Sequence, residues 1–120
     1  FEIIAGIIES GETPENVVRR ECIEETGCEI TDIIPVYQYL VTPGGSSETM
    51  FLFCGRVNSA TATGIHGVAT EGEDIRVFVV SATEAFLMLD SQKIYNSMTI
   101  IALQWLKVNR DIVRKKWLKK

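Results

Sequence analysis

The spacing of apolar residues along the chain predicts both strands and helices. Residues 29–40 and 50–57 concentrate β-branched and aromatic side chains, and turn-forming residues at 42–47 separate them, which predicts two strands. Residues 75–80 (Ile-Arg-Val-Phe-Val-Val) give the clearest strand prediction. Residues 1–9 are predicted to form a strand that runs into a loop.

Three helices are predicted, at residues 14–26, from about residue 81, and from about residue 97 to beyond Trp105. In the last of them, apolar residues recur at three and four positions, which predicts a face packed on the core: Met98, Ile101, Ala102, Trp105 and Val108. Residues 60–74 are poor in bulky apolar side chains and are predicted as a loop. The whole predicts a mixed α/β fold of the α+β type, with helices on a mostly non-sequential sheet.

Composition bounds the class of protein. A chain of 120 residues with 46% apolar side chains predicts one globular domain, residues 1–120. Because Phe1 is not an initiator Met and already begins a predicted strand, we expect an N-terminal portion to be absent from this chain. The three cysteines include no C-x-x-C pair, so buried thiols are expected rather than disulfides or a zinc site.

The charge distribution argues against nucleic acid as a partner. The net charge is −4, and half of the basic residues lie in 110–120, so the remainder of the chain is strongly acidic. The basic end is expected to be a solvated helix terminus rather than a phosphate-binding arm. No signal peptide and no run of eighteen apolar residues is present, which predicts a cytoplasmic protein without a membrane span.

The predicted helix at 14–26 carries an unusual group of acids. Glu21, Glu24 and Glu25 are three and four residues apart and therefore share one face. Their carboxylates repel one another near the helix C-terminus, where the macrodipole disfavours anions. A solvated acidic face is one explanation. A divalent cation is the other, and hard oxygen ligands favour Mg²⁺ or Mn²⁺ over zinc.

The residues around this helix follow a known motif. Gly6, five residues, Glu12, seven residues and then 20–28 (Arg-Glu-Cys-Ile-Glu-Glu-Thr-Gly-Cys) match G-x5-E-x7-R-E-U-x-E-E-x-G-U, where U is apolar. This pattern resembles the Nudix box, and every fixed position is met, with cysteine at both U positions after the arginine. The resemblance implies a Nudix-like α/β/α sandwich with a mixed sheet and a loop-helix-loop metal site.

Nudix hydrolases cleave a nucleoside diphosphate linked to another moiety, so the resemblance implies that activity and a nucleoside diphosphate substrate. It also implies two or three Mg²⁺ ions, with Mn²⁺ as a substitute. The implied metal ligands are three carboxylates and one backbone carbonyl, those of Glu21, Glu24, Glu25 and Ala5. The implied structural residues of the motif are Gly6, Glu12, Arg20 and Gly27.

Segments outside the box resemble one group of the family, the bacterial ADP-ribose pyrophosphatases. Pro43 follows Gly27 by sixteen residues, and 64–67 (Gly-Ile-His-Gly), 71–77 and 101–106 are also similar to that group. The resemblance implies hydrolysis of ADP-ribose to AMP and ribose 5-phosphate by a homodimer.

The same resemblance implies roles for residues in two loops. Glu71 corresponds to the catalytic base and Glu73 to a second, metal-linked acid, although a polar loop kept soluble by its charge is the alternative. Thr42 and Glu48 correspond to positions near the terminal ribose or the opposite subunit, although turn chemistry explains them equally well. His66 could be a general base, but its place between two glycines favours a loop residue.

Two alternative functions remain open from the sequence. The chain could hydrolyse another sugar nucleotide or a dinucleotide with the same metal chemistry. It could also be a non-catalytic sensor of ADP-ribose, but a sensor is expected to lack acids of the box, and all of them are present.

Overall fold

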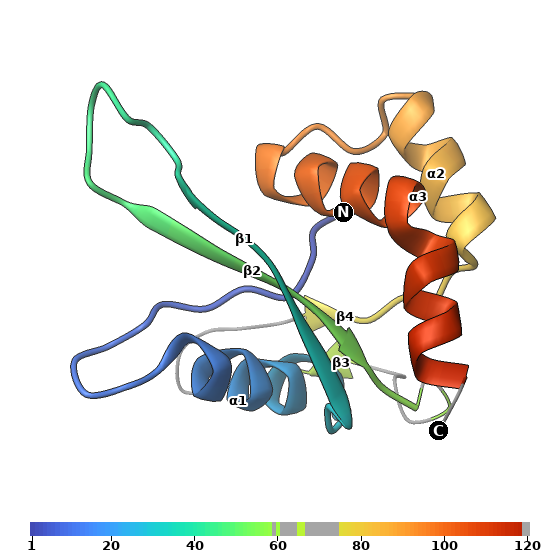
Figure 1. Cartoon of the computed structure of the whole chain (residues 1–120), viewed down its shortest axis with the longest axis horizontal. Helices are drawn as coiled ribbons and strands as arrows, with labels where there is room; N and C mark the ends of the chain where they lie inside the picture. The colour runs from blue at the N-terminus through green and yellow to red at the C-terminus, as the bar shows by residue number, and fades with distance from the viewer. Residues whose placement is uncertain (59, 61–64, 67–74, 119–120) are drawn as a thin grey trace. The chain divides into compact units, whose positions relative to one another are not determined.

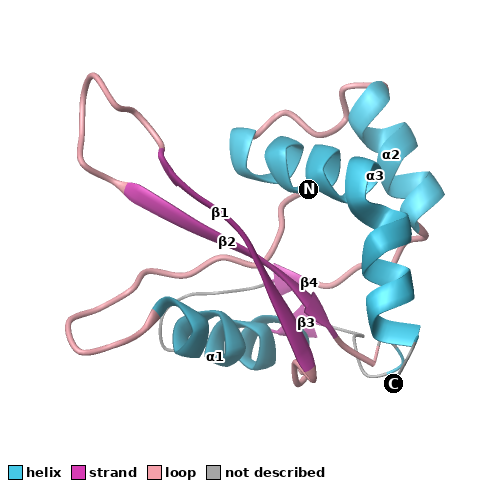
Figure 2. Cartoon of the chain, viewed as in Figure 1, coloured by secondary structure: helices cyan, strands magenta, loops and turns pink. Residues whose placement is uncertain are grey.

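The computed structural model describes residues 1–58, 60, 65–66 and 75–118, which form two compact units (Figure 1). One unit is Ile4–Val79, and the other combines Phe1–Ile3 with Val80–Lys120. Helices and short antiparallel strands are both present in the described residues (Figure 2), so the α/β composition is confirmed. The elements are α1 (Pro14–Thr26), β1 (Asp32–Leu40), β2 (Thr49–Arg56), β3 (Ile65–His66), β4 (Ile75–Arg76), α2 (Ala82–Asp90) and α3 (Ser97–Leu118).

Strands β1 and β2 form an antiparallel hairpin, close to the two strands predicted from the sequence. Asp32 pairs with Arg56 at one end, and Leu40 pairs with Thr49 at the other. The register shifts between Pro35 and Tyr37, where β1 contains one extra residue. In Figure 1 the turn that joins the two strands lies far from α1.

Three strand or loop predictions are wrong at particular residues. Residues 1–9 contain no strand, and the predicted strand at 75–80 is reduced to β4. Both segments have apolar side chains suited to a strand, but strand propensity is realised only where a partner strand pairs with them. In contrast, 65–66 lie in β3 and pair with β4, so the predicted loop at 60–74 is interrupted and the backbone of His66 is extended.

The core of the unit Ile4–Val79 is formed by residues of α1 and of the segment that follows it. Cys22, Cys28 and Ile30 are buried together, and partly buried apolar residues pack against them: Ile4, Val18, Ile33 and Val77. All three cysteines are thiols rather than disulfides, as predicted, with Cys54 only half-buried. Burial raises the pKa of the Cys22 thiol, and a hydrogen bond with Thr26 acts in the opposite direction.

In the second unit, α2 and α3 begin within one residue of the predicted starts at about 81 and 97, and a side chain caps the first turn of each. The Ser81 hydroxyl accepts a hydrogen bond from the Glu84 amide at 3.1 Å, and the Asn96 side chain accepts one from the Thr99 amide at 3.0 Å. The first residues of the chain belong to this unit, because the amide of Ile3 donates to the Thr99 hydroxyl at 3.2 Å.

The predicted core face of α3 is correct for its first turns and wrong at its end. Met98, Ile101, Ala102 and Trp105 are half-buried, whereas Val108 is 81% exposed. The buried positions of the helix are Thr99 and Val113. Val108 is nine residues from Thr99, and at 3.6 residues per turn this places it on the opposite side of the helix.

Candidate functional site

Helix α1 has defined ends, and both were predicted. The hydroxyl of Thr13 accepts a hydrogen bond from the amide of Asn16 at 3.3 Å, and Pro14 occupies the first helical position. Gly27 adopts the left-handed conformation with φ 73°, and its amide donates to the carbonyl of Ile23 at 2.9 Å. These local signals fix which residues of the motif lie on successive turns of one helix.

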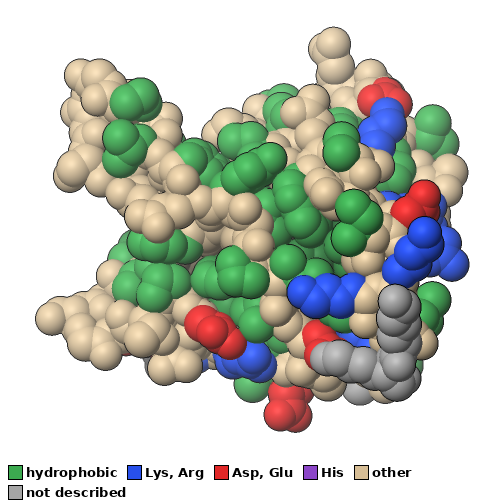
Figure 3. Space-filling model, viewed as in Figure 1, with side chains coloured by type: hydrophobic (Ala, Val, Ile, Leu, Met, Phe, Trp, Pro, Cys, Tyr) green, Lys and Arg blue, Asp and Glu red, His purple; other side chains and the backbone are tan. Residues whose placement is uncertain are grey.

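A single arginine lies among the acids of the motif. Nη1 of Arg20 is 3.0 Å from Oε1 of Glu21 and 3.5 Å from Oε2 of Glu24. Its other terminal nitrogen, Nη2, lies 3.2 Å and 3.4 Å from the two oxygens of Glu12. Figure 3 shows acidic and basic side chains next to one another over α1. Arg20 therefore joins carboxylates from the helix and from the preceding loop.

The charges around Arg20 also change its protonation equilibrium. Desolvation lowers the pKa of the Arg20 guanidinium, but the three glutamates act in the opposite direction and together raise it above its ordinary value. The guanidinium is therefore always charged at physiological pH.

Glu12 links the loop before α1 to the helix. One of its oxygens accepts a hydrogen bond from the amide of Glu9 at 3.1 Å, and the amide of Glu12 donates to the carbonyl of Glu9 at 3.0 Å. Because the same carboxylate is paired with Arg20 on the helix, the turn at 9–12 is fixed against α1.

The backbone at residues 5 and 6 lies directly on two acids of the helix. The amide of Ala5 donates a hydrogen bond to Oε2 of Glu25 at 3.3 Å. A Cβ added at Gly6 would collide with the carboxyl group of Glu21, so only glycine allows the loop to approach this closely. The structure therefore brings the predicted Ala5, Glu21 and Glu25 to one place.

The chemical nature of these residues suits a hard divalent cation, but their arrangement in this structure does not form a complete set of metal ligands. They offer carboxylate oxygens and a nearby backbone carbonyl, which are the ligands that Mg²⁺ prefers. However, within residues 1–58, 60, 65–66 and 75–118, no three acidic, cysteine or histidine side chains converge as a metal-binding group. The reason is visible in the contacts: Glu21 and Glu24 face Arg20, while Glu25 faces the Ala5 amide.

The predicted loop residues are not brought to α1 by the described part of the structure. Thr42 and Glu48 lie in the exposed turn of the hairpin, where the Thr42 carbonyl accepts from the amides of Gly45 and Ser46 at 3.0 and 2.9 Å. The amide of Glu48 is bonded to the Ser46 hydroxyl at 3.0 Å. These are turn contacts. Glu71 and Glu73 lie outside the described residues.

One contact that positions α1 was not foreseen from the sequence. Nη1 of Arg19 donates to the carbonyl of Ile30 at 2.9 Å, while its Nη2 pairs with Glu15 at 3.1 Å. The Glu15 pair follows from the four-residue spacing, but the bond to Ile30 depends on how the chain turns after Gly27, and no local signal predicts it. Arg19 thereby holds the helix against the segment that leads into β1.

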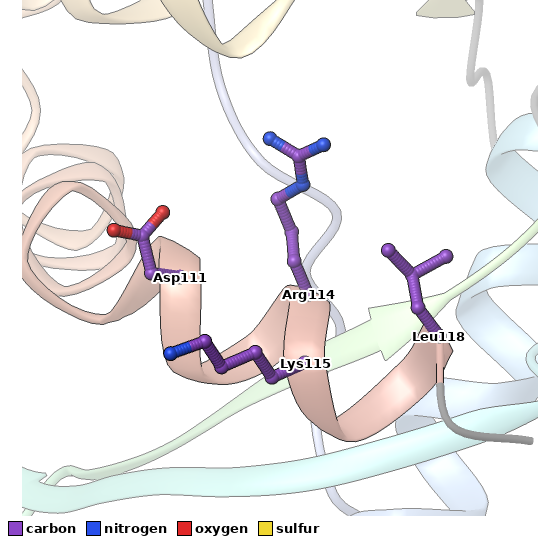
Figure 4. A pocket seen from close by; sticks show the side chains of 4 residues that line it. All are labelled: Asp111, Arg114, Lys115 and Leu118. Carbon is purple, nitrogen blue, oxygen red and sulfur yellow. The ribbon is translucent and has the colours of Figure 1, made fainter.

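A surface hollow occurs elsewhere, on α3. The described residues that line it are Asp111, Arg114, Lys115 and Leu118, from the last turns of α3 (Figure 4). It contains none of the motif residues, and it is open to solvent.

No helix within the described residues is long and apolar enough to cross a membrane.

Comparison with known proteins gives the family. The NUDIX domain model matches residues 1–99. The chain is 46% identical over 117 residues to the ADP-ribose pyrophosphatase of Escherichia coli strain K12, which corresponds to 98% of this chain and 56% of that protein. The corresponding values for the ADP-ribose pyrophosphatase of Haemophilus influenzae are 42% identity, 98% of this chain and 54% of that protein.

A more distant group of relatives carries another name. The GDP-mannose pyrophosphatase of Citrobacter koseri is 30% identical over 106 residues, covering 88% of this chain and 54% of that protein. The chain thus spans about half the length of the curated relatives it matches.

Proposed function

Because the chain belongs to the Nudix family, we propose that it hydrolyses the pyrophosphate of ADP-ribose and releases AMP and ribose 5-phosphate. The observation that carries this proposal is the 46% identity, over 98% of the chain, to a protein named ADP-ribose pyrophosphatase. Relatives named GDP-mannose pyrophosphatase are similar at only 30% identity, which favours ADP-ribose as the substrate.

Nudix hydrolases typically use a divalent metal, and the proposal assigns two or three Mg²⁺ ions, with Mn²⁺ as a substitute. Glu21, Glu25 and the carbonyl of Ala5 would hold them, with Glu24 and Glu73 as further ligands. The close approach of the loop backbone to the carboxylates of Glu21 and Glu25 supports this assignment. When bound, such ions supply neutralisation of the diphosphate charge and Lewis acidity.

The chain's own residues take the remaining roles. Glu71 is the proposed general base, which accepts a proton from the water that attacks phosphorus. Glu12 and Arg20 are the structural residues of the motif and hold the turn at residues 9–12 against α1. Thr42 and Glu48 are proposed to contact the terminal ribose or the second subunit of a homodimer.

We also propose the fold of the whole chain. Residues 1–120 form a single Nudix domain, an α/β/α sandwich with a mixed sheet around the loop-helix-loop site. The family match to residues 1–99 supports this, because that range includes residues of both compact units. A cytoplasmic location is part of the same proposal.

Hydrolysis of another sugar nucleotide is the second candidate, favoured by the similarity to GDP-mannose pyrophosphatase. A sensor without activity is disfavoured, since every acid of the box is present.

The test is turnover by the purified protein with Mg²⁺, using ADP-ribose, ADP-glucose, GDP-mannose and NADH in parallel. We expect preferential cleavage of ADP-ribose, with AMP and ribose 5-phosphate as products. Preferential cleavage of GDP-mannose would show that the substrate assignment is wrong and would leave the proposed metal chemistry unchanged. Metal binding without turnover of any substrate would favour the sensor.

A further inference from the structure

Arg20 occupies the same carboxylates that the proposed cations need. Its Nη1 is shared between Glu21 at 3.0 Å and Glu24 at 3.5 Å, and both acids are proposed metal ligands. The side chain of Glu21 is only 13% exposed, so its pairing with Arg20 is shielded from water more than the pairing of Glu24, at 32%. Nη1 lies on one oxygen of each carboxylate, Oε1 of Glu21 and Oε2 of Glu24, so a divalent cation that binds at these two oxygens has to displace the guanidinium.

Glu12 gives the guanidinium a second place to bind. Nη2 is held by both oxygens of Glu12, and this carboxylate is itself fixed by the Glu9 amide. Arg20 can therefore give up Glu21 and Glu24 without losing every partner, because a carboxylate outside the proposed ligand set remains bonded to it. Thus Nη1 of Arg20 binds two proposed metal ligands, whereas Nη2 binds Glu12, which is not a proposed ligand.

We propose that Arg20 is an internal counter-ion that competes with the divalent cation for Glu21 and Glu24. Without metal, it neutralises the repulsion between these carboxylates and stabilises α1. When a cation binds, Arg20 releases the two acids and stays on Glu12, so that its charge lowers the metal affinity of the site. This inference rests on the proposed metal site, and its test separates the failure of one from the failure of the other.

A residue that only positions Glu21 would behave in the opposite way. Losing it would disorder a ligand and weaken metal binding. If Arg20 instead competes with the metal, its removal frees the carboxylate oxygens and also removes a positive charge that repels the metal ion. Metal binding then becomes tighter. The sign of the change in affinity therefore distinguishes the two roles.

The experiment compares wild type with Arg20→Gln by titration with Mn²⁺ in the absence of substrate, followed calorimetrically. Arg19→Gln is the matched control, since it removes the same charge from the adjacent position, where the partners are Glu15 and the Ile30 carbonyl. We expect Arg20→Gln to bind Mn²⁺ about tenfold more tightly, and Arg19→Gln to bind within about twofold of wild type.

Thermal unfolding gives an independent readout. Arg20→Gln should have a lower Tm than wild type in EDTA, because its carboxylates are no longer compensated, and a larger rise in Tm when Mn²⁺ is added. If this variant is unfolded in EDTA, Arg20→Lys provides the comparison. A lysine keeps the charge but not the two-nitrogen fork, so its Mn²⁺ affinity should lie between those of wild type and Arg20→Gln.

Weaker Mn²⁺ binding by Arg20→Gln, with the control unchanged, would overturn the competition and leave Arg20 as a positioning residue. Equal affinities of wild type and Arg20→Gln would also overturn it. If none of the proteins binds Mn²⁺, the proposed metal site is itself wrong, and the role of Arg20 is lost with it.

Discussion

The amide of Ala5 donates a hydrogen bond to Oε2 of Glu25, a residue twenty positions further along the chain. This contact places the loop backbone against the face of α1 that carries the acids. It leaves the Ala5 carbonyl in the immediate neighbourhood, where the proposed metal site requires a backbone ligand. Changes to the loop and to the helix should therefore have related effects.

Glu25→Gln should reduce hydrolysis of ADP-ribose by about 10²- to 10³-fold, because it removes a charged metal ligand. An amide oxygen can still accept the hydrogen bond from Ala5, so the midpoint of urea unfolding in EDTA should change little. Steady-state kinetics and unfolding curves measure the two effects. Glu15→Gln, on the same helix but outside the acidic face, should retain activity. Near-native turnover by Glu25→Gln would contradict the metal assignment.

Gly6→Ala should lower kcat/KM by about 10²-fold, because the added methyl group displaces the Glu21 side chain and moves a ligand. Mn²⁺ affinity, measured by titration without substrate, should fall as well. Gly44→Ala is a suitable control, since nothing lies within 4 Å of a Cβ at that position. If Gly6→Ala were as active as Gly44→Ala, the close approach of loop and helix would have no functional importance.

Gly27→Ala should destabilise the protein by about 1–2 kcal/mol, because an L-residue with a side chain is disfavoured at φ 73°. Gly27→Asn should cost less, since asparagine tolerates this conformation better. Urea denaturation followed by far-UV circular dichroism would measure both. Equal stabilities of the alanine variant and wild type would show that the end of α1 relaxes to another conformation.

Val77→Asp should destabilise the fold by at least about 2 kcal/mol, because Val77 packs against the cluster of Cys22, Cys28 and Ile30. Val79→Asp introduces the same charge two residues later, where the side chain is 56% exposed, and should change stability by less than about 0.5 kcal/mol. Chemical denaturation of the pair tests the assignment of the core. Similar losses in both variants would contradict it.

The buried thiol of Cys22 should make folding stability fall at alkaline pH. Its pKa is raised in the folded protein from an ordinary value of 9.0, so the folded state holds a proton that the unfolded state releases. This contribution is complete below pH 9.0 and decreases as the pH rises through that value toward the folded pKa. The free energy of unfolding should therefore decline less steeply above pH 9.0 in Cys22→Ala than in wild type.

The elements that the sequence predicted well are those with local signals. The cap at Thr13, the proline at the first helical position and the left-handed Gly27 define α1 without reference to the rest of the chain. The hairpin follows in the same way from two β-prone runs and a turn between them. The acids of α1 could also be found, because their spacing on the helix is fixed by its geometry.

What the sequence could not predict depends on contacts between distant residues. Residues 1–9 and 77–80 have strand-forming side chains, but no strand pairs with them in the described structure. Arg20 was likewise predicted to be structural. The sequence does not show that its guanidinium is shared between Glu12 in the loop and two proposed ligands on the helix, because this depends on how the loop and the helix pack together.

The register shift in β1 determines which side chains of the hairpin share a face. Pro35 pairs with Phe53 and Tyr37 with Leu52, so Val36 is the one residue inserted into β1 at the shift. Because side chains alternate in direction along a strand, inserting one residue reverses the face that the following residues would occupy in a regular strand. The faces on which the side chains of residues 37–40 lie, up to the turn at Thr42, therefore depend on this single residue.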